Sequence, residues 1–315
     1  MNQLIQAAVN RCPVTYHEEY TDPFTNKLLK HVYTLNKNLK LAPGVSSIGA
    51  NNAKDFLPFW YAKETVTFLG YFDPTKTPKE QGMARLIECH KAVKAMTAEA
   101  YLKHLEQAKG AAPRKAKEAT NHGELAHYWC NLYIKARLGE IDVPNYQALT
   151  PEAQSSVRAF LAWEEAHDVH WLSGDIVIGS EVHEYGGRPD GLCSIDGIPT
   201  LVDFKTSNQI SEDYFIQTAG YHIALKEMGL DMWQRLILRV PKDGKDFEAL
   251  IVPTPLDLDC EAFLALRQVQ RWKSYIENTA NGVKDTAGKV LVPPYRKHFA
   301  PHNEKAATKS TKNAA

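Results

Sequence analysis

Apolar residues recur every three or four positions through much of the N-terminal half of the chain. This spacing follows one face of a helix and runs through residues 78–107 and 151–168. The aromatic-rich residues 53–72 predict a buried helix, and residues 41–48 (LAPGVSSI) predict a turn that leads into a helix start. Residues 1–40 are polar and mixed in character. We therefore expect a helical N-terminal region.

A basic stretch with glycine and proline, residues 109–118 (KGAAPRKAKE), follows these helices. Its composition predicts an exposed loop or hinge. The next segment, residues 120–140, predicts a helix that Thr120 or Asn121 caps and that Gly139 ends.

The pattern changes at residue 176, where short runs rich in β-branched residues begin. Strands are predicted in IVIGSEV, GLCSI, TLVDF, RLILRV and ALIVP. Asp196-Gly197 lies between the second and third of these runs and is a strong hairpin signal. Helical spacing returns in residues 211–229 and 256–278, and the polar tail from about residue 303 is expected to be disordered.

This order of elements predicts an α/β (α+β) protein, with a central mixed β-sheet flanked by helices. We expect residues 1–118 to form a mostly helical region with a basic linker, and residues 119–280 to form the core domain. Residues 281–315 would be a C-terminal extension.

Composition limits the functional classes. The 315 residues include no apolar run of the roughly 18 residues that a membrane span needs, and the first residues do not resemble a secretory signal, so we expect a cytoplasmic protein. The five cysteines are far apart and form no CxxC, which argues against a disulfide framework, a zinc knuckle and an iron–sulfur cluster. Basic and acidic residues both number 37, so any contact with DNA must come from local patches.

The candidate chemistry lies around the predicted hairpin, in EVHEYGGRPDGLCSIDGIPTLVDFKTS. The hairpin can place Asp190 and Asp203 near one end of the sheet. Asp203 and Lys205 share a strand face because they are two residues apart, whereas Phe204 points into the core. Two carboxylates suit Mg²⁺ or Mn²⁺, and a nearby ammonium suits the charge of a phosphodiester under attack.

The same residues resemble a known family. GRPDG followed by VDFK is similar to the PD-(D/E)XK nucleases and, within them, to the RecB-like branch, closest to phage-type and mitochondrial exonucleases. The segments GELAH, with His127, and QTAGY, with Gln217 and Tyr221, are similar to the family's G-x-x-x-H and Q-x-x-x-Y motifs. PGVSS at positions 43–47 resembles the family's PSVTT more weakly. The resemblance covers roughly residues 41–275.

The resemblance implies a restriction-endonuclease-like fold and a deoxyribonuclease with two Mg²⁺ or Mn²⁺ ions. His127, Asp190, Asp203 and the Phe204 carbonyl would be metal ligands, and Lys205 would be catalytic. No iron–sulfur cluster is implied, and the chain has no G-x-x-x-x-G-K-[ST] motif for ATP.

The resemblance further assigns Glu181 the family's upstream acidic role, with Glu184 as the competing candidate. Gln217 and Tyr221 would hold the DNA strand or the catalytic lysine.

The expected activity is exonucleolytic cleavage of single-stranded DNA or duplex ends, in phage-type recombination, repair or processing. A recombination or single-strand annealing protein is a compatible partner, and no feature indicates the oligomeric state. Lys115 and Lys117 belong either to a DNA-guiding loop or to a solvated charge run. The alternative functions are a non-catalytic nucleic-acid-binding protein with the nuclease fold and a restriction-like endonuclease. The His-containing residues 164–170 lack the order of a metalloprotease zinc site.

Overall fold

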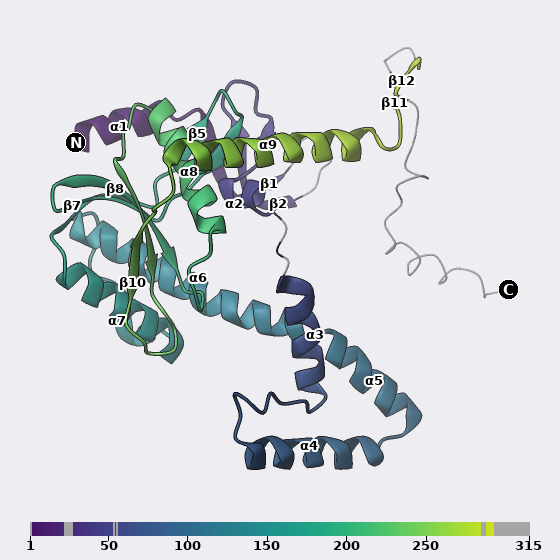
Figure 1. Ribbon diagram of the computed structural model, residues 1–315. Helices are drawn as coiled ribbons and strands as arrows, with labels where there is room; N and C mark the ends of the chain where they lie inside the picture. The colour runs from purple at the N-terminus through teal and green to yellow at the C-terminus, as the bar shows by residue number, and fades with distance from the viewer. Residues whose placement is uncertain (1, 22–27, 53, 55, 285–287, 293–315) are drawn as a thin grey trace.

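Figure 1 shows a computed structural model of the chain, which describes all residues except 1, 22–27, 53, 55, 285–287 and 293–315. The expected disordered tail from residue 303 lies outside the described residues. None of the described helices is both long and apolar enough to cross a bilayer.

The central element is a five-stranded mixed sheet with the order β10-β9-β8-β7-β4. Its strands are β4 (Val169–Gly174), β7 (Gly191–Ile195), β8 (Ile198–Lys205), β9 (Gln234–Arg239) and β10 (Glu248–Ile251). The predicted hairpin joins β7 to β8, and Asp196 and Gly197 both have positive φ, 51° and 81°, as a tight two-residue turn requires. β8 and β9 are parallel, while the other pairs are antiparallel. The mixed sheet is confirmed, and β4 is a strand that the hydrophobic pattern did not predict.

Helices cover both faces of this sheet (Figure 1). On one face lie α6 (Ala111–Arg137) and α7 (Pro151–Glu165), and on the other α8 (Asp213–Glu227) and α9 (Leu256–Thr279). Adjacent β8 residues show the alternation, because Leu201 packs into the core that contains Tyr221 and Phe263, whereas Val202 packs with Trp129 and Phe160. By the same alternation, Asp203 and Lys205 lie on the α8 side of β8.

The expectation of a helical N-terminal region is wrong for much of residues 1–42. Among the described residues of this stretch, α1 (Asn2–Asn10) is the one helix, and it is followed by an antiparallel sheet of β1 (Val14–Thr21), β2 (Leu28–Leu35) and β3 (Leu41–Ala42). These strands are rich in Val, Tyr and Thr, which favour strand structure.

The turn and helix start expected at residues 41–48 are confirmed, since α2 (Val45–Gly49) begins there. The small hairpin of β5 (Ile178–Ser180) and β6 (Tyr185–Gly187) packs beside this region, and the Gly186 N–H donates to the Pro43 carbonyl.

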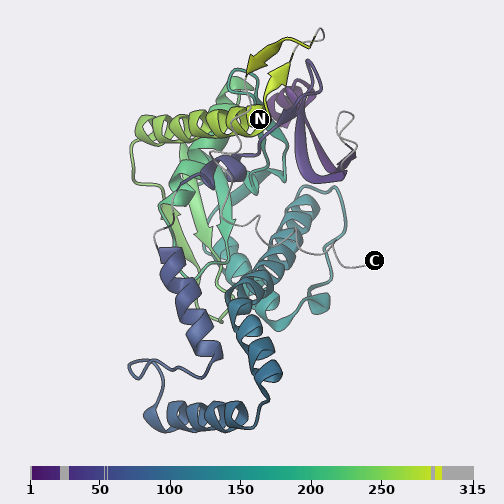
Figure 2. The ribbon, with the colours of Figure 1, turned by 90° about the vertical axis from the view of Figure 1, so that its right-hand side faces the viewer.

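Three helices and the first half of α6 form an arm that projects from the body (Figures 1 and 2). They are α3 (Phe56–Phe68), α4 (Lys79–Lys94) and α5 (Ala98–Lys109). These helices were expected, but the burial expected for residues 53–72 is wrong: Phe56 is 61% exposed and Phe59 78%. The aromatic-rich composition indicated the helix, but it did not indicate how much of the helix packs against other elements.

Residues 109 and 111–118 are helical where a loop or hinge was expected, and Gly110 forms the turn between α5 and α6. Lys109 ends α5, and α6 runs without interruption from Ala111 to Arg137. Pro113 is tolerated because it lies in the first turn of α6, where backbone N–H groups have no helical acceptor. Thr120 and Asn121 are therefore inside a helix and cap nothing.

The remaining expected elements are confirmed. Gly139 follows α6 with a φ of 77°, and Gly229 follows α8 with a φ of 82°. The other short elements are the 3₁₀ helix η1 (Tyr146–Ala148) and the strands β11 (Val283–Lys284) and β12 (Val290–Val292).

Candidate active site

The β7–β8 hairpin brings Asp190 beside Asp203. Gly191 pairs with Val202, so Asp190, which directly precedes β7, reaches the last residues of β8. The Phe204 N–H donates a hydrogen bond of 2.7 Å to Asp190 Oδ2. The turn and the pairing register thus place two carboxylates at one end of the sheet, as the sequence predicted.

Lys205 completes this cluster. Its Nζ lies 2.6 Å from Asp203 Oδ2 and 4.7 Å from the centre of the Tyr214 ring. Asp203 is 1% exposed, so this ion pair is shielded from water. Phe204, on the other face, packs edge-to-face against Phe160, with 5.2 Å between ring centres. This packing fixes the strand from behind the cluster.

Helix α8 supplies side chains that hold the lysine. Lys205 Nζ donates to Gln217 Oε1 at 3.0 Å, and Gln217 Nε2 donates to the Tyr221 hydroxyl at 2.9 Å. The same Nε2 lies 3.5 Å from Asp203 Oδ1. Gln217 and Tyr221 therefore share one helix face, and the structure places Gln217 against the lysine, one of the two positions that the resemblance allowed.

Helix α6 brings His127 to the cluster from the opposite side of the sheet end. His127 Nδ1 lies 3.1 Å from Asp190 Oδ1. One turn earlier, Gly123 faces Thr206, and a Cβ added at Gly123 would lie 2.7 Å from Thr206 Oγ1. Gly123 thus lets α6 approach Thr206 closely, and this approach allows His127, the last residue of the G-x-x-x-H segment, to reach Asp190.

Burial and neighbouring charges shift the ionisation of these groups. Burial would lower the pKa of His127, but the Asp190 carboxylate outweighs it and the pKa is raised above its usual value. Burial would likewise lower the pKa of Lys205, yet Asp203 and Asp190 raise it. For Asp190, His127 and Lys205 overcome burial and lower the pKa, whereas burial dominates at Asp203 and raises its pKa. Asp190 is therefore the firmly ionised carboxylate of the two.

The donor atoms suit a hard divalent cation, which prefers carboxylate oxygens. Asp203 Oδ2 is buried, and within the described part of the chain it accepts no well-aligned hydrogen bond besides its ion pair with Lys205. Among the described residues, however, no three His, Cys, Asp or Glu side chains are arranged to hold a metal ion, and residues 164–170 are no exception. The cations around the two carboxylates in this geometry are Lys205 and His127.

Four residues that were predicted to be functional lie away from the cluster of Asp190, Asp203 and Lys205. Glu181 is 61% exposed and pairs with Lys37 at 3.7 Å, and Glu184 also faces Lys37 at 3.7 Å. Lys115 is bound to Glu64 at 2.8 Å, which ties α6 to α3 in the arm. Lys117 also belongs to the arm, in the first turns of α6. The structure thus brings neither glutamate into contact with Asp190, and Lys115 is engaged in an ion pair within the protein.

The structure adds two residues that the sequence reasoning missed. The Asp175 N–H donates to the Asp190 carbonyl at 3.3 Å, and the Asp175 carboxylate pairs with Arg188. The Arg188 guanidinium also lies over the Tyr16 ring, 4.2 Å from its centre. The signal for Arg188 was its position in GRPDG, two residues before Asp190; the signal for Asp175 was absent, because its position depends on pairing between β4 and β7.

No model of a known protein family matches the chain, and a search of the curated proteins finds no match.

Proposed function

We propose that the chain is a metal-dependent deoxyribonuclease of the PD-(D/E)XK type that degrades single-stranded DNA or duplex ends from a terminus. The observation that supports this most strongly is the buried cluster of Asp190, Asp203 and Lys205 at the end of β8, where Lys205 Nζ lies 2.6 Å from Asp203. Buried charges are costly to maintain for stability alone, and buried, mutually perturbed titratable groups are typical of functional sites.

Each side chain has a task in this proposal. Asp190 and Asp203, with His127, would hold one or two Mg²⁺ or Mn²⁺ ions, which would supply a water of lowered pKa and polarise the phosphate. Lys205 would offset the negative charge that develops on the phosphate. Gln217 would orient the lysine through the 3.0 Å hydrogen bond, and Tyr221 would fix Gln217 in turn.

The charge distribution offers a local surface for DNA. Residues 54–118, which include the arm, contain 12 of the 37 basic residues but 8 of the 37 acidic ones, and the rest of the chain has 25 and 29. The near-zero net charge therefore conceals a basic arm and an acidic remainder. Exposed Phe56, Phe59 and Tyr61 on α3 are suited to stacking on unpaired bases, which favours a single-stranded substrate.

A time course on end-labelled DNA tests this proposal. Linear and circular single strands and linear duplex are incubated with Mg²⁺, Mn²⁺ or EDTA. We expect release of short products from linear single strands with either metal, and no cleavage of circles or in EDTA. Cleavage of the circle would indicate an endonuclease, and binding without cleavage would indicate a non-catalytic protein.

Asp203→Asn provides the inactive variant for this assay. Asp196→Asn is its matched control, because Asp196 is a carboxylate at the other end of β8, in a turn that asparagine also favours. Equal rates for Asp203→Asn and wild type would refute the site.

A further inference from the structure

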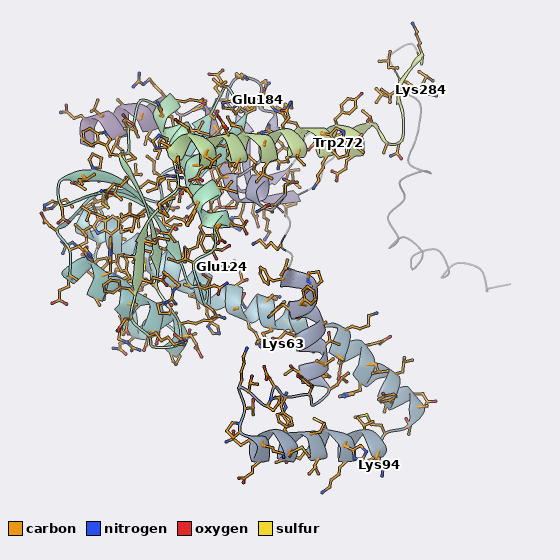
Figure 3. All side chains as sticks on the ribbon, in the orientation of Figure 1. Lys63, Lys94, Glu124, Glu184, Trp272 and Lys284 are labelled. Atoms are coloured by element: carbon orange, nitrogen blue, oxygen red, sulfur yellow. The ribbon has the colours of Figure 1, made fainter. Side chains whose placement is uncertain are left out.

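A pocket lies away from the carboxylate cluster, between α9 and the N-terminal sheet. Its volume is about 730 Å³. Figure 3 shows Glu184, one of its residues, beside α9. The lining residues come from β1, β2, β3, the β5–β6 hairpin and one side of α9. They include Tyr20, Lys40, Leu41, Glu184, Arg267, Arg271 and Tyr275.

Cations dominate the charge of this pocket. Among the described residues that line it, Arg267, Arg271 and Lys40 are the cations and Glu184 is the one acid. Arg267 is 8% exposed and donates to the carbonyls of His183 and Glu184 at 3.0 Å. Burial lowers the pKa of Arg267 to about 10, which leaves it charged at neutral pH.

Arg271 and Lys40 are the available cations of the pocket. The side chain of Arg271 is 41% exposed and that of Lys40 67%, and they lie 3.7 Å and 4.0 Å from Glu184. One carboxylate cannot neutralise three cations, so the pocket keeps a positive surplus that suits a phosphate group.

Aromatic and apolar groups lie beside these cations. Tyr20 and Tyr275 line the pocket, and Tyr275 is 57% exposed on α9. Leu41 adds an apolar edge and is 38% exposed. A phosphate-binding surplus next to accessible aromatic rings is the combination that holds single-stranded nucleic acid, because bases stack on the rings while cations follow the backbone.

The pocket is also close to the proposed site along the chain. Glu184 directly precedes β6, which leads through Arg188 to Asp190. Asp190 lies six positions after Glu184, so their Cα atoms are at most about 20 Å apart. A strand bound at the carboxylate cluster needs only a few nucleotides to reach the pocket.

We propose that this pocket binds a nucleotide of the single strand outside the catalytic centre. This inference rests on the proposed nuclease function, whose substrate it specifies as a strand several nucleotides long. Arg271 contacts a phosphate, and Tyr275 stacks on a base.

The test compares Arg271→Gln and Tyr275→Ala with Lys226→Gln, a matched control at an exposed lysine in the last turn of α8, outside both the pocket and the arm. All three are made in the Asp203→Asn background, so that binding is measured without cleavage. Fluorescence anisotropy gives the affinity for labelled oligonucleotides of about 4 and about 15 nucleotides across a salt series. Circular dichroism and thermal melting confirm that each variant is folded.

We expect each pocket variant to bind the long oligonucleotide roughly five- to tenfold more weakly, because a phosphate contact or a stacked base is lost. For Arg271→Gln, the slope of log affinity against log salt should fall by about 1. The shortest oligonucleotide should be affected less. With cleavage restored at Asp203, KM should rise on long substrates while kcat stays near the wild-type value.

Pocket variants that bind the long oligonucleotide as tightly as Lys226→Gln would overturn this inference, even if the wild type cleaves DNA normally. A mononucleotide that binds the pocket as tightly as the long oligonucleotide would also overturn it, since the pocket would then take free nucleotide. Wild-type protein that neither binds nor cleaves DNA would instead refute the proposed function itself.

Discussion

Replacing Lys205 with methionine tests how the cluster is balanced electrostatically. Methionine keeps much of the length and apolar stem of lysine but removes its charge. Asp203 is 1% exposed, and in this variant it would lose the ammonium that lies 2.6 Å from its Oδ2 in the wild type. Removing one member of a buried ion pair leaves an uncompensated charge, which costs about 3–5 kcal/mol.

The expected cost is at the lower end, about 3 kcal/mol, because two features soften it. Gln217 Nε2 stays 3.5 Å from Asp203 Oδ1, and the raised pKa of Asp203, caused by burial, makes proton uptake easier. For a chain of this size, such a loss lowers the melting temperature by roughly 4–5 °C. The measurement is thermal or urea unfolding in EDTA, with Lys103→Met as a surface control that should change stability by less than about 0.5 kcal/mol.

The same variant should respond more strongly to Mg²⁺. Two carboxylates without the competing ammonium attract a divalent cation more tightly, and a ligand at 100 times its Kd stabilises the folded state by about 2.7 kcal/mol. We expect Mg²⁺ to restore most of the stability of Lys205→Met while its DNA cleavage stays absent. Equal stability of variant and wild type in EDTA, or an equal response to Mg²⁺, would refute the electrostatic account of the site.

Two further predictions concern α6. Gly123→Val should lower cleavage at least tenfold, because a Cβ 2.7 Å from Thr206 Oγ1 pushes His127 away from Asp190. Gly49→Ala is the control, since an added Cβ at Gly49 meets no atom within 4 Å. Full activity of Gly123→Val would contradict the close approach of α6 to Thr206. Protonated His127 stabilises the metal-free fold, because the pKa of His127 is raised in the folded state. This stabilisation is complete at a pH below 6.5, the ordinary pKa of histidine, and it is lost as the pH rises through the raised pKa. In EDTA, the melting temperature of the wild type should therefore fall over that range more than that of His127→Gln, and parallel curves would show that the ion pair with Asp190 does not form.

The centre of the site followed from local rules. A strand places residues two apart on one face, which predicted that Asp203 and Lys205 lie together, and the Asp196-Gly197 turn set the register that brings Asp190 alongside. These features depend on residues within one strand or one hairpin, so one sequence suffices to predict them.

The features that were missed depend on context beyond the local sequence. β1 has polar residues on both faces, so it lacks the alternation that would have marked it as a strand. Pro113 indicated a break but lies in the first turn of α6, where proline is tolerated. The exposure of Phe59 and the position of Glu181 are set by which distant segments pack nearby, and neither a helical period nor an acidic residue upstream of Asp190 contains that information.

The most direct test of the proposed nuclease site is the rate at which nucleotides are released from end-labelled linear single-stranded DNA in Mg²⁺. The rate is compared for wild type, Asp203→Asn and Asp196→Asn. We predict metal-dependent release by wild type and by Asp196→Asn. In Asp203→Asn the rate of release should fall at least a hundredfold while the fold is retained. Release by Asp203→Asn at the wild-type rate, or no release by wild type with either Mg²⁺ or Mn²⁺, would contradict it.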